Sequence, residues 1–315
     1  MPSLPFVDRY RGYIGACFPE FMLRTFEFVG GSSCRVFLAN RDTYFRFAHS
    51  EKGARTIRKE RKFFSHIRNR VPLAVPFYSM YSEGCGEFNH PVAGYKAVPG
   101  VPVAGIKLSS EAPIQLGRFL KALHALPCPP GWEAEGSRIP ADRAQQLLGQ
   151  IEAHRTALTV EQLSWTRGLF KDFLASTASR TPHPVVLVHN DIDHYNILCD
   201  ESTGQLTGII DAEESTVGDP ARDFTPMRAE FGRAFVESAL HAYGGPPDPY
   251  FVARVAFWSA ALPFHEMLYG IEKNAGVHVE NALARLDRAV RGEDITGGWP
   301  LVKTAASAGW GEASD

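Results

Sequence analysis

The sequence has few cysteines and lacks any long run of uncharged apolar residues. Its five cysteines are scattered and form no C-x-x-C pair, which argues against a disulfide framework and against a structural zinc site. We therefore expect reduced thiols. The N-terminal stretch MPSLPFVDRYRGY carries charge and proline where a signal peptide needs an apolar segment, and no apolar run is long enough to span a bilayer. These absences predict a cytoplasmic protein without a membrane partner.

An excess of positive charge is also missing. Lys plus Arg number 33 and Asp plus Glu number 35, so no general basic field exists to attract nucleic acid. The chain has 315 residues, of which 44% are hydrophobic, enough to bury a sizeable core in two domains or in one bilobal unit. We find neither an internal repeat nor a low-complexity segment.

The first third of the chain is dominated by strand patterns. FEFVGGSSCRVFLA (26–39) and RDTYFRFA (41–48) predict three antiparallel strands. An amphipathic helix is expected over 52–71, where apolar residues recur at helical spacing, and it should end before Pro72. Two more strands are expected within 75–81 and 90–103, and the Pro99–Gly100 pair closes this region.

The rest of the chain reads as mainly helical. A helix is expected over 112–127, a helical pattern runs from about 133 to 179, and helices resume after Pro226 up to about Arg291. A strand pair, 185–189 and 206–214, interrupts them. The sequence thus predicts an α+β, bilobal fold, with a small N-terminal lobe (1–98) of five antiparallel strands and one helix, a larger helical lobe (99–315), and a nucleotide bound between the lobes.

Polar residues follow the first strand of this pair in the stretch VLVHNDIDHYNIL. His189, Asp191 and Asn196 match H-x-D-x-x-x-x-N, the spacing of a kinase catalytic loop, and the next strand leads to Asp211, fifteen positions after Asn196. An acceptor hydroxyl needs a carboxylate base, and magnesium takes oxygen ligands from Asp and Asn. A plain polar turn explains the stretch without chemistry, but the second aspartate at the right distance favours phosphoryl transfer.

With these motifs the sequence resembles the aminoglycoside phosphotransferases, which have a protein-kinase-like fold, and most closely the branch that phosphorylates the 2''-hydroxyl. The resemblance rests on HNDIDHYNIL, LTGIIDAEESTVGDPARDF and PFHEMLYGIEKN, among other segments. It implies that Asp191 is the catalytic base, that Asn196 and Asp211 hold Mg²⁺, and that Lys96 to Pro99, including Val98, touch the base of ATP or GTP. It also implies that Asp219 and Asp223 brace the loops.

Two departures from the family concern the nucleotide site. Arg46 stands where the family usually has lysine, and we expect it to pair with Glu60 and to reach the phosphates through its planar fork. Ala212 follows the metal-binding aspartate where an aromatic residue is common, and the acids after it, Glu213 and Glu214, are expected to face solvent. Ser32 and Ser33, in the turn after Gly30 and Gly31, either contact phosphate or belong to a plain hairpin turn.

Other conspicuous residues have simpler interpretations. We expect His189 to order its loop and His124 to be a core histidine with satisfied hydrogen bonds, whereas His194 either approaches the substrate or is an exposed loop residue. The aromatic residues Trp165, Phe257 and Trp258 are expected in the core, since no basic groove accompanies them.

The acceptor should be chosen by carboxylates, because a polycationic aminoglycoside needs several anionic partners. The candidates are Asp193, Glu230, Glu237 and Glu266, of which Glu266 is the best placed by resemblance; an unpartnered surface acid is the alternative for each. The sequence therefore predicts an aminoglycoside kinase that confers resistance. The alternatives are a kinase of another alcohol, such as a macrolide or a metabolite, and a nucleotide-binding protein without catalysis. A protein kinase is disfavoured because no A-P-E segment follows Asp211.

Overall fold

The computed structural model describes residues 4–31, 33–132 and 138–293, and it divides the chain into two compact units. The first unit comprises residues 1–109 and 195–215, and the second comprises 110–194 and 216–315. The expected lobe boundary at residue 98 remains a prediction. Across the described ranges, no helix combines the length and the apolar character that a membrane crossing requires.

The first unit is built on the five-stranded antiparallel sheet that the sequence predicts. The strand order is β1-β2-β3-β5-β4, and every neighbouring pair is antiparallel. The strands are β1 (Phe26–Gly30), β2 (Cys34–Ala39), β3 (Thr43–Ala48), β4 (Met80–Ser82) and β5 (Val92–Lys96). The fold class, α+β with an N-terminal antiparallel sheet, is confirmed.

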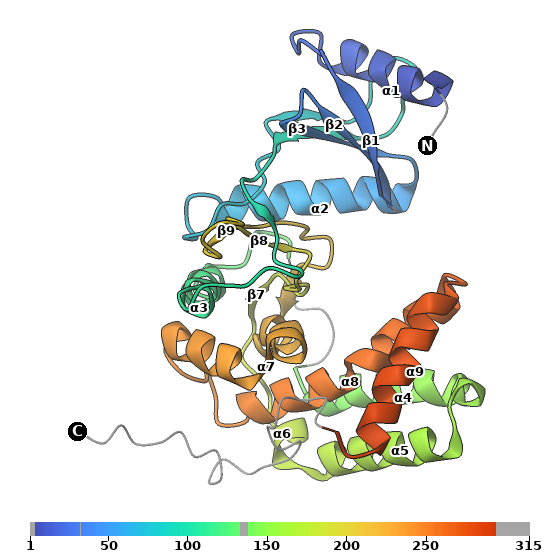
Figure 1. The fold of residues 1–315 in the computed structure, drawn as a ribbon, viewed down its shortest axis with the longest axis vertical. Coiled ribbons are helices and arrows are strands. Elements are labelled where there is room, and N and C mark those ends of the chain that lie inside the picture. The colour runs from blue at the N-terminus through green and yellow to red at the C-terminus, as the bar shows by residue number, and fades with distance from the viewer. Residues whose placement is uncertain (1–3, 32, 133–137, 294–315) are drawn as a thin grey trace. The chain divides into compact units, whose positions relative to one another are not determined.

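Two helices cover the two faces of this sheet (Figure 1). Side chains alternate along β3, so Phe45 and Phe47 join an aromatic cluster with helix α1 (Leu4–Cys17), while Arg46 faces helix α2 (Glu51–Ile67). The expectation of a single helix is wrong, because α1 was not foreseen. Its signal is the aromatic residues that recur at helical spacing in FVDRYRGY.

Helix α2 packs closely on the start of β2. The side chain of Ser50 caps its first turn by accepting a hydrogen bond from the backbone N–H of Gly53. A Cβ atom at Gly53 would lie 2.2 Å from the carbonyl oxygen of Ser33, so only glycine permits this approach. The close contact fixes Ser33, which lies at the mouth of the pocket described below.

A disulfide joins Cys17, the last residue of α1, to Cys85, with a Cα–Cα distance of 5.3 Å. The expectation that all cysteines are thiols is therefore wrong for these two. The prediction failed because the two cysteines are separated by 68 positions, and nothing in the sequence pattern indicates that they lie close together. The remaining cysteines, Cys34, Cys128 and Cys199, are free thiols.

The two strands of the expected C-terminal pair have different partners. Strand β9 (Leu206–Ile209) pairs with β8 (Ile197–Cys199), which also pairs with β6 (Val101–Pro102), all within the first unit. Strand β7 (Val186–Val188) pairs with β10 (Thr216–Gly218) in the second unit. The prediction that both segments contain strands is confirmed, but the prediction that they pair with each other is wrong.

The second unit is helical apart from β7 and β10. Its core gathers aromatic residues from α5 and α8, and Phe173 stacks on Phe257 with ring centroids 3.7 Å apart. Trp258 lies in the same core and Trp165 packs against it, as expected. The helices are α3 (Ala112–His124), α4 (Pro140–Ala153), α5 (Val160–Ala175), α6 (Thr177–Arg180), α7 (Ala221–Tyr243), α8 (Phe251–Glu272) and α9 (Gly276–Val290), with a short 3-10 helix at Arg155–Ala157.

Helix α7 begins earlier than the sequence predicts. It starts at Ala221 and contains Pro226, which the sequence reading took as the residue before the helices. Pro226 is the sixth residue of α7, so its missing N–H removes the hydrogen bond that a helix would otherwise form there to the carbonyl of Arg222. Gly232, at φ 81°, interrupts the helical backbone of α7 further on.

Helices α3 and α7 approach each other at Gly117, where an added methyl group would lie 2.0 Å from the carbonyl oxygen of Ala239. We predict that Gly117→Ala lowers the free energy of unfolding by about 2 kcal/mol, through overpacking. Gly149 in α4 is the matched control, because nothing lies within 4 Å of a Cβ there. Gly149→Ala should raise the stability by about 0.5 to 1 kcal/mol through helix propensity. Urea denaturation measures both, and equal effects would contradict the close approach.

Candidate active site

The first unit contains a cavity of about 380 Å³, a volume typical of sites for small molecules. Apolar residues from β2, β8 and the segment after β5 form part of its wall, among them Val36, Val98 and Leu198. Its polar lining comes from Ser33, Arg46, Asp211 and Glu213. The cavity thus combines an apolar slot with a charged end, as a nucleotide requires.

Arg46 forms the expected ion pair with Glu60, which confirms this part of the prediction. The same guanidinium nitrogen donates a hydrogen bond to the hydroxyl of Tyr78 at 3.3 Å, and both partners are buried. Burial opposes the charge on Arg46, but the Glu60 carboxylate outweighs it and holds the pKa of Arg46 well above its ordinary value. Arg46 therefore keeps a fixed positive charge at the cavity wall. Tyr78, which the sequence reading did not single out, braces both members of the pair.

Glu60 links α2 to the segment that carries Asp211. Its carboxylate accepts a hydrogen bond from the backbone N–H of Ala212 at 3.2 Å. Burial raises the pKa of Glu60 against the opposing effect of Arg46, and the negative charges of Asp211 and Glu213 raise it further. This concentration of acid at one end of the cavity favours the binding of a cation.

Asn196 and Asp211 lie at adjoining positions of the β8–β9 pair. The carbonyl oxygen of Asn196 accepts a hydrogen bond from the N–H of Ile210 at 2.9 Å, one residue past the registered pair Ile197–Ile209. Asp211 adopts a left-handed backbone, φ 61°, which is uncommon outside glycine and is often found at functional sites. Carboxylate and amide oxygens are hard donors that fit Mg²⁺, which needs few protein ligands besides phosphate and water. The chemistry of these residues is consistent with their predicted role.

Glu213 does not face solvent as the sequence reading expected. It accepts hydrogen bonds from the hydroxyls of Ser33 at 3.1 Å and Thr56 at 3.2 Å, while Glu214 is exposed. The contacts bring the turn between β1 and β2 to the segment after Asp211. Sequence reasoning missed Glu213 because its partners lie more than 150 positions away.

The residues predicted to touch the nucleotide base differ in their contacts. Val98 lines the cavity, and Tyr95 lines it as well. The Lys96 side chain is 69% exposed, and its ammonium group lies 2.6 Å from the Asp42 carboxylate. The predicted contact of Lys96 with a nucleotide would therefore be made by its backbone. Ser32 lies outside the described residues.

The loop that precedes Asp191 is held in the second unit by Asp223. Its carboxylate accepts hydrogen bonds from the backbone N–H groups of His189, at 3.0 Å, and Asn190, and from a ring nitrogen of His124 at 2.9 Å. The other ring nitrogen of His124 lies 3.0 Å from the Tyr243 hydroxyl. These contacts confirm that Asp223 braces the loop and that His124 is a satisfied core histidine.

Asp219 has the other expected bracing role. Its carboxylate accepts hydrogen bonds from the buried Arg254, with Nε at 2.7 Å, and from the backbone N–H of Ala221 at 3.0 Å. The same guanidinium group binds Asp248 at 2.7 Å. Asp219 thus anchors the start of α7 to α8.

Three of the four acids predicted to bind the acceptor have a basic side chain of the same unit beside them, and for Glu230 it is His194. Glu237 pairs with Arg233 at 2.6 Å, and Glu266 lies 3.5 Å from Arg285 and 3.6 Å from His278. In this structure a side chain of the protein lies beside each of these carboxylates, at the place where the prediction puts a group of the ligand.

Glu230 pairs with His194, whose ring nitrogen lies 2.7 Å from its carboxylate. Burial raises the pKa of Glu230, and the nearby Asp193 raises it as well, against the effect of His194. His194 is therefore not a solitary loop residue, and its approach to the substrate stays a prediction. Asp193, the fourth of these acids, lies near enough to Glu230 for its charge to raise the pKa of that residue.

A five-stranded antiparallel sheet with a buried arginine–glutamate pair, a polar cavity and hard oxygen donors defines a kinase-like unit. The model of the phosphotransferase enzyme family matches residues 26–254. The chain belongs to this family, and it is an enzyme that transfers phosphate to a hydroxyl of a small molecule.

Solved structures show the same fold. The complex of APH(2'')-IIIa with GDP and kanamycin matches with a TM-score of 0.78 at 21% identity, over 90% of this chain and 98% of that one. The macrolide 2'-phosphotransferase MphH from Brachybacterium faecium matches with a TM-score of 0.66 at 21% identity, over 90% and 98%. The uncharacterized protein YcbJ of Bacillus subtilis (strain 168) is 29% identical over 103 residues, which are 32% of this chain. The chain spans about a third (33%) of the length of that curated relative.

The Arg46 contacts lead to a prediction. A lysine carries its three donors on one nitrogen and lacks the planar fork by which Arg46 spreads its donors over several groups. Arg46→Lys should raise the nucleotide KM about three- to thirty-fold, as expected for the loss of one charge-assisted contact, and Arg46→Ala should raise it further. Arg58→Lys, at an exposed pair with Glu83, is the control. If wild type and both Arg46 variants bind nucleotide equally in titrations, the phosphates are held elsewhere.

Proposed function

We propose that this chain transfers the γ-phosphate of a nucleoside triphosphate, ATP or GTP, to a hydroxyl group, with Asp191 as the base. The observation that carries the proposal is the cavity of the first unit, in which Arg46, paired with Glu60, and Asp211 line one wall. A positive fork and a metal-binding carboxylate in one pocket suit a triphosphate. The solved neighbours crystallised with GDP or ADP support a nucleotide donor.

Each residue has a definite task in this proposal. Arg46 binds and orients the phosphates, and the segment Lys96 to Val98 contacts the base through its backbone and the Val98 side chain. Asn196 and Asp211 hold Mg²⁺, which when bound neutralises the charge on the phosphates. Asp191 takes the proton from the acceptor hydroxyl at its carboxylate oxygen. The chain itself supports this grouping, because Asp191 stands only five positions before Asn196.

An aminoglycoside is the acceptor that the resemblance implies. Solved neighbours include complexes with kanamycin, gentamicin and streptomycin. This finer proposal would give the protein a role in antibiotic resistance. Its binding acids would be Asp193, Glu230, Glu237 and Glu266, and each paired acid would have to exchange its internal partner for an ammonium group of the antibiotic.

A second class of acceptor is favoured by those same pairs. Exchanging one ion pair for another gains little free energy, because the arginine or histidine released must find a new partner or be solvated. An alcohol that is not a polycation requires no such exchange. A macrolide sugar or a hydroxylated metabolite is therefore the second candidate, and solved macrolide phosphotransferases share the fold.

A panel assay tests the function. The purified chain is incubated with Mg²⁺, ATP or GTP, and in turn aminoglycosides, macrolides and other alcohols, and transfer of labelled phosphate is measured. We expect transfer to at least one acceptor and its loss on removing Mg²⁺ with a chelator. Nucleotide hydrolysis that no acceptor in a broad panel stimulates would contradict the proposal.

Two substitutions separate the roles of the acids. Asp191→Asn should keep nucleotide affinity and lose roughly two to four decades of turnover, the range for a positioned general base. Asp211→Ala should abolish Mg²⁺-dependent nucleotide binding as well. Asp172→Asn, an exposed residue of α5, is the control and should leave both quantities unchanged. Normal turnover by Asp191→Asn with every active acceptor would show that another group is the base.

A further inference from the structure

The loop that carries Asp191 has no regular secondary structure of its own. Strand β7 ends at Val188 and β8 begins at Ile197, and residues 189–193 belong to neither a helix nor a strand. A general base must lie within about 3 Å of the hydroxyl whose proton it takes. A displacement of about 1 Å can cost on the order of a hundredfold in rate. The position of Asp191 therefore depends on the side chains that hold this loop.

The start and the middle of the loop are held in two different ways. Asp223, in the first turn of α7, accepts hydrogen bonds from the backbone N–H groups of His189 and Asn190. Ile192, the residue after Asp191, is fully buried, so its apolar side chain anchors the middle of the loop in the protein interior. The base is thus fixed on the side that precedes it and at its immediate neighbour.

The end of the loop is held by Glu230, further along α7. One carboxylate oxygen of Glu230 accepts a hydrogen bond from the backbone N–H of His194 at 2.8 Å, and the other oxygen lies 2.7 Å from the ring nitrogen Nδ1 of the same residue. Because both oxygens engage one residue, the contact fixes the backbone and the side chain of His194 together. Hydrogen bonds to an ionised carboxylate are about twice as strong as those between neutral groups.

The spacing of the two acids on α7 matches the length of the loop. Asp223 and Glu230 are seven positions apart, which is two helical turns, so they lie on one face of α7 and about 10 Å apart along its axis. Gly232 interrupts the helix only after both of them. The four steps from Asn190 to His194 span at most about 14 Å when extended. Fastened at both ends, the stretch that contains Asp191 has little slack.

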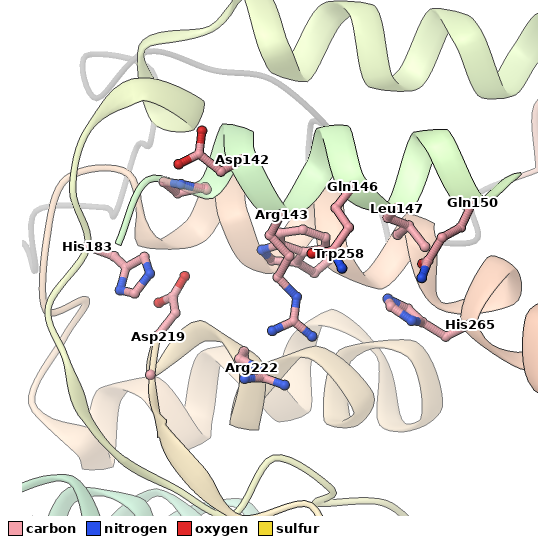
Figure 2. Close-up of a pocket in the computed structure, with 12 residues that line it drawn as sticks. Asp142, Arg143, Gln146, Leu147, Gln150, His183, Asp219, Arg222, Trp258 and His265 are labelled. Atoms are coloured by element: carbon pink, nitrogen blue, oxygen red, sulfur yellow. The ribbon is translucent and has the colours of Figure 1, made fainter. Parts of the chain in front are cut away.

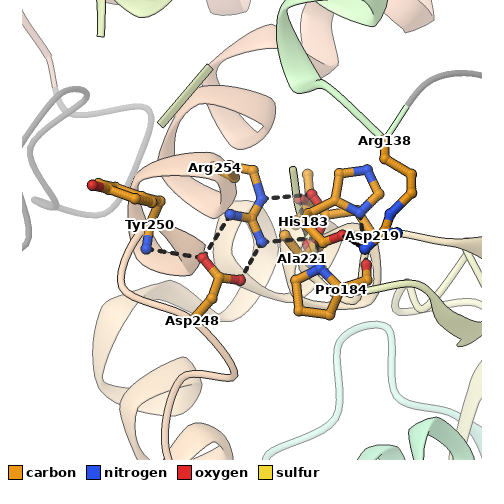
Figure 3. A network of polar contacts seen from close by, with 9 residues as sticks. Arg138, His183, Pro184, Asp219, Ala221, Asp248, Tyr250 and Arg254 are labelled. Atoms are coloured by element: carbon orange, nitrogen blue, oxygen red, sulfur yellow. Dashed lines mark hydrogen bonds and ion pairs between the residues drawn. The ribbon is translucent and has the colours of Figure 1, made fainter. Parts of the chain in front are cut away.

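Helix α7 is a firm support for these contacts. Asp219 binds the N–H of Ala221, the first residue of α7, at 3.0 Å, and it binds the buried Arg254 of α8, with Nε at 2.7 Å. Arg254 also binds Asp248 (Figure 3). Breaking a buried, hydrogen-bonded ion pair is costly, so the start of α7 is tied to α8. Asp223 and Glu230 therefore act from a fixed element.

The pocket at the start of α7 takes no part in holding the loop. It has a volume of about 350 Å³, and its lining includes Arg143 of α4, His265 of α8 and, from α7, Arg222 (Figure 2). Among the described residues that line it, neither Asp223 nor Glu230 is present. A molecule in this pocket would leave both carboxylates with the loop.

We propose that Glu230 is a positioning residue for phosphoryl transfer. Through His194 it fastens the end of the loop that carries Asp191, and it does not bind the acceptor. The inference rests on the proposed function, in which Asp191 is the base, and it gives Glu230 a different task from the one that the resemblance implies. An ammonium group bound to Glu230 would compete with His194 for the same two oxygens and would loosen the loop just when Asp191 must be in place.

Steady-state kinetics of the full chain separate the two tasks. Glu230→Ala should lower kcat about ten- to hundredfold, as expected for a displaced base, and leave the KM of acceptor and nucleotide within about twofold. Glu230→Gln, which keeps one acceptor oxygen, should lower kcat less, about three- to tenfold. Glu280→Ala, at an exposed position of α9, is the control and should change neither quantity. A raised acceptor KM with an unchanged kcat would make Glu230 an acceptor-binding acid and would overturn the inference.

His194 provides a second readout, because Glu230 is proposed to act through it. His194→Leu should lower kcat, and His194→Asn, whose amide nitrogen can stand near the place of Nδ1, should restore most of it. The double variant Glu230→Ala/His194→Leu should be no slower than Glu230→Ala alone, since both changes remove the same contact. Effects on kcat that multiply in the double variant would show that the two residues act separately and would contradict the inference.

Hydrogen exchange at the backbone N–H of His194 requires no acceptor. Glu230→Ala should accelerate this exchange about tenfold, for the loss of one charge-assisted hydrogen bond, and Glu280→Ala should not. Thermal midpoints show which variants fold, and Glu230→Gln carries both measurements if Glu230→Ala does not. An unchanged exchange rate would overturn the inference. If exchange accelerates as expected but the wild type phosphorylates no acceptor, the fastening of the loop by Glu230 stands and the proposed function alone fails.

Discussion

The arrangement of the second unit depends on one buried carboxylate, that of Asp223. It receives N–H groups from the two residues that precede Asp191 and from His124 of α3, so a single group orders the loop and joins it to two helices. Burial favours its neutral form, but the hydrogen bond and charge of His124 prevail and lower the pKa of Asp223. A fixed negative charge is thus available to hold backbone donors. Asn190, at φ 68°, adopts the left-handed conformation within this brace.

The sequence was sufficient where local pattern and spacing carry the information. Alternating apolar residues predicted the five strands, and the spacing from His189 through Asn196 to Asp211 predicted which residues stand at strand ends. The Arg46–Glu60 pair was predicted from the resemblance to the family, in which a lysine usually stands at the position of Arg46. These features depend on residues whose relation is set by one strand, one helix or one turn.

The features that escaped prediction depend on contacts between distant segments. Helix α1 is short of apolar aliphatic residues, and its aromatic face becomes clear only beside the sheet that it covers. The Cys17–Cys85 disulfide, the partners of Glu213 and the pairing of β7 with β10 all join residues far apart in sequence. The acids predicted to bind the acceptor have partners both near and far in sequence. Glu237 is neutralised by an arginine one turn away, but the partner of Glu230 lies 36 positions earlier.

Charge is distributed differently in the two units, and this difference bears on substrate choice. In the first unit Glu60, Asp211 and Glu213 accumulate negative charge beside one arginine, a balance that suits a metal ion with its phosphates. In the second unit Glu230, Glu237 and Glu266 are paired internally, while two arginines meet in a cavity. The fold and the donor chemistry can be shared across a family while the acceptor changes, because the acceptor is selected by side chains that the fold does not constrain.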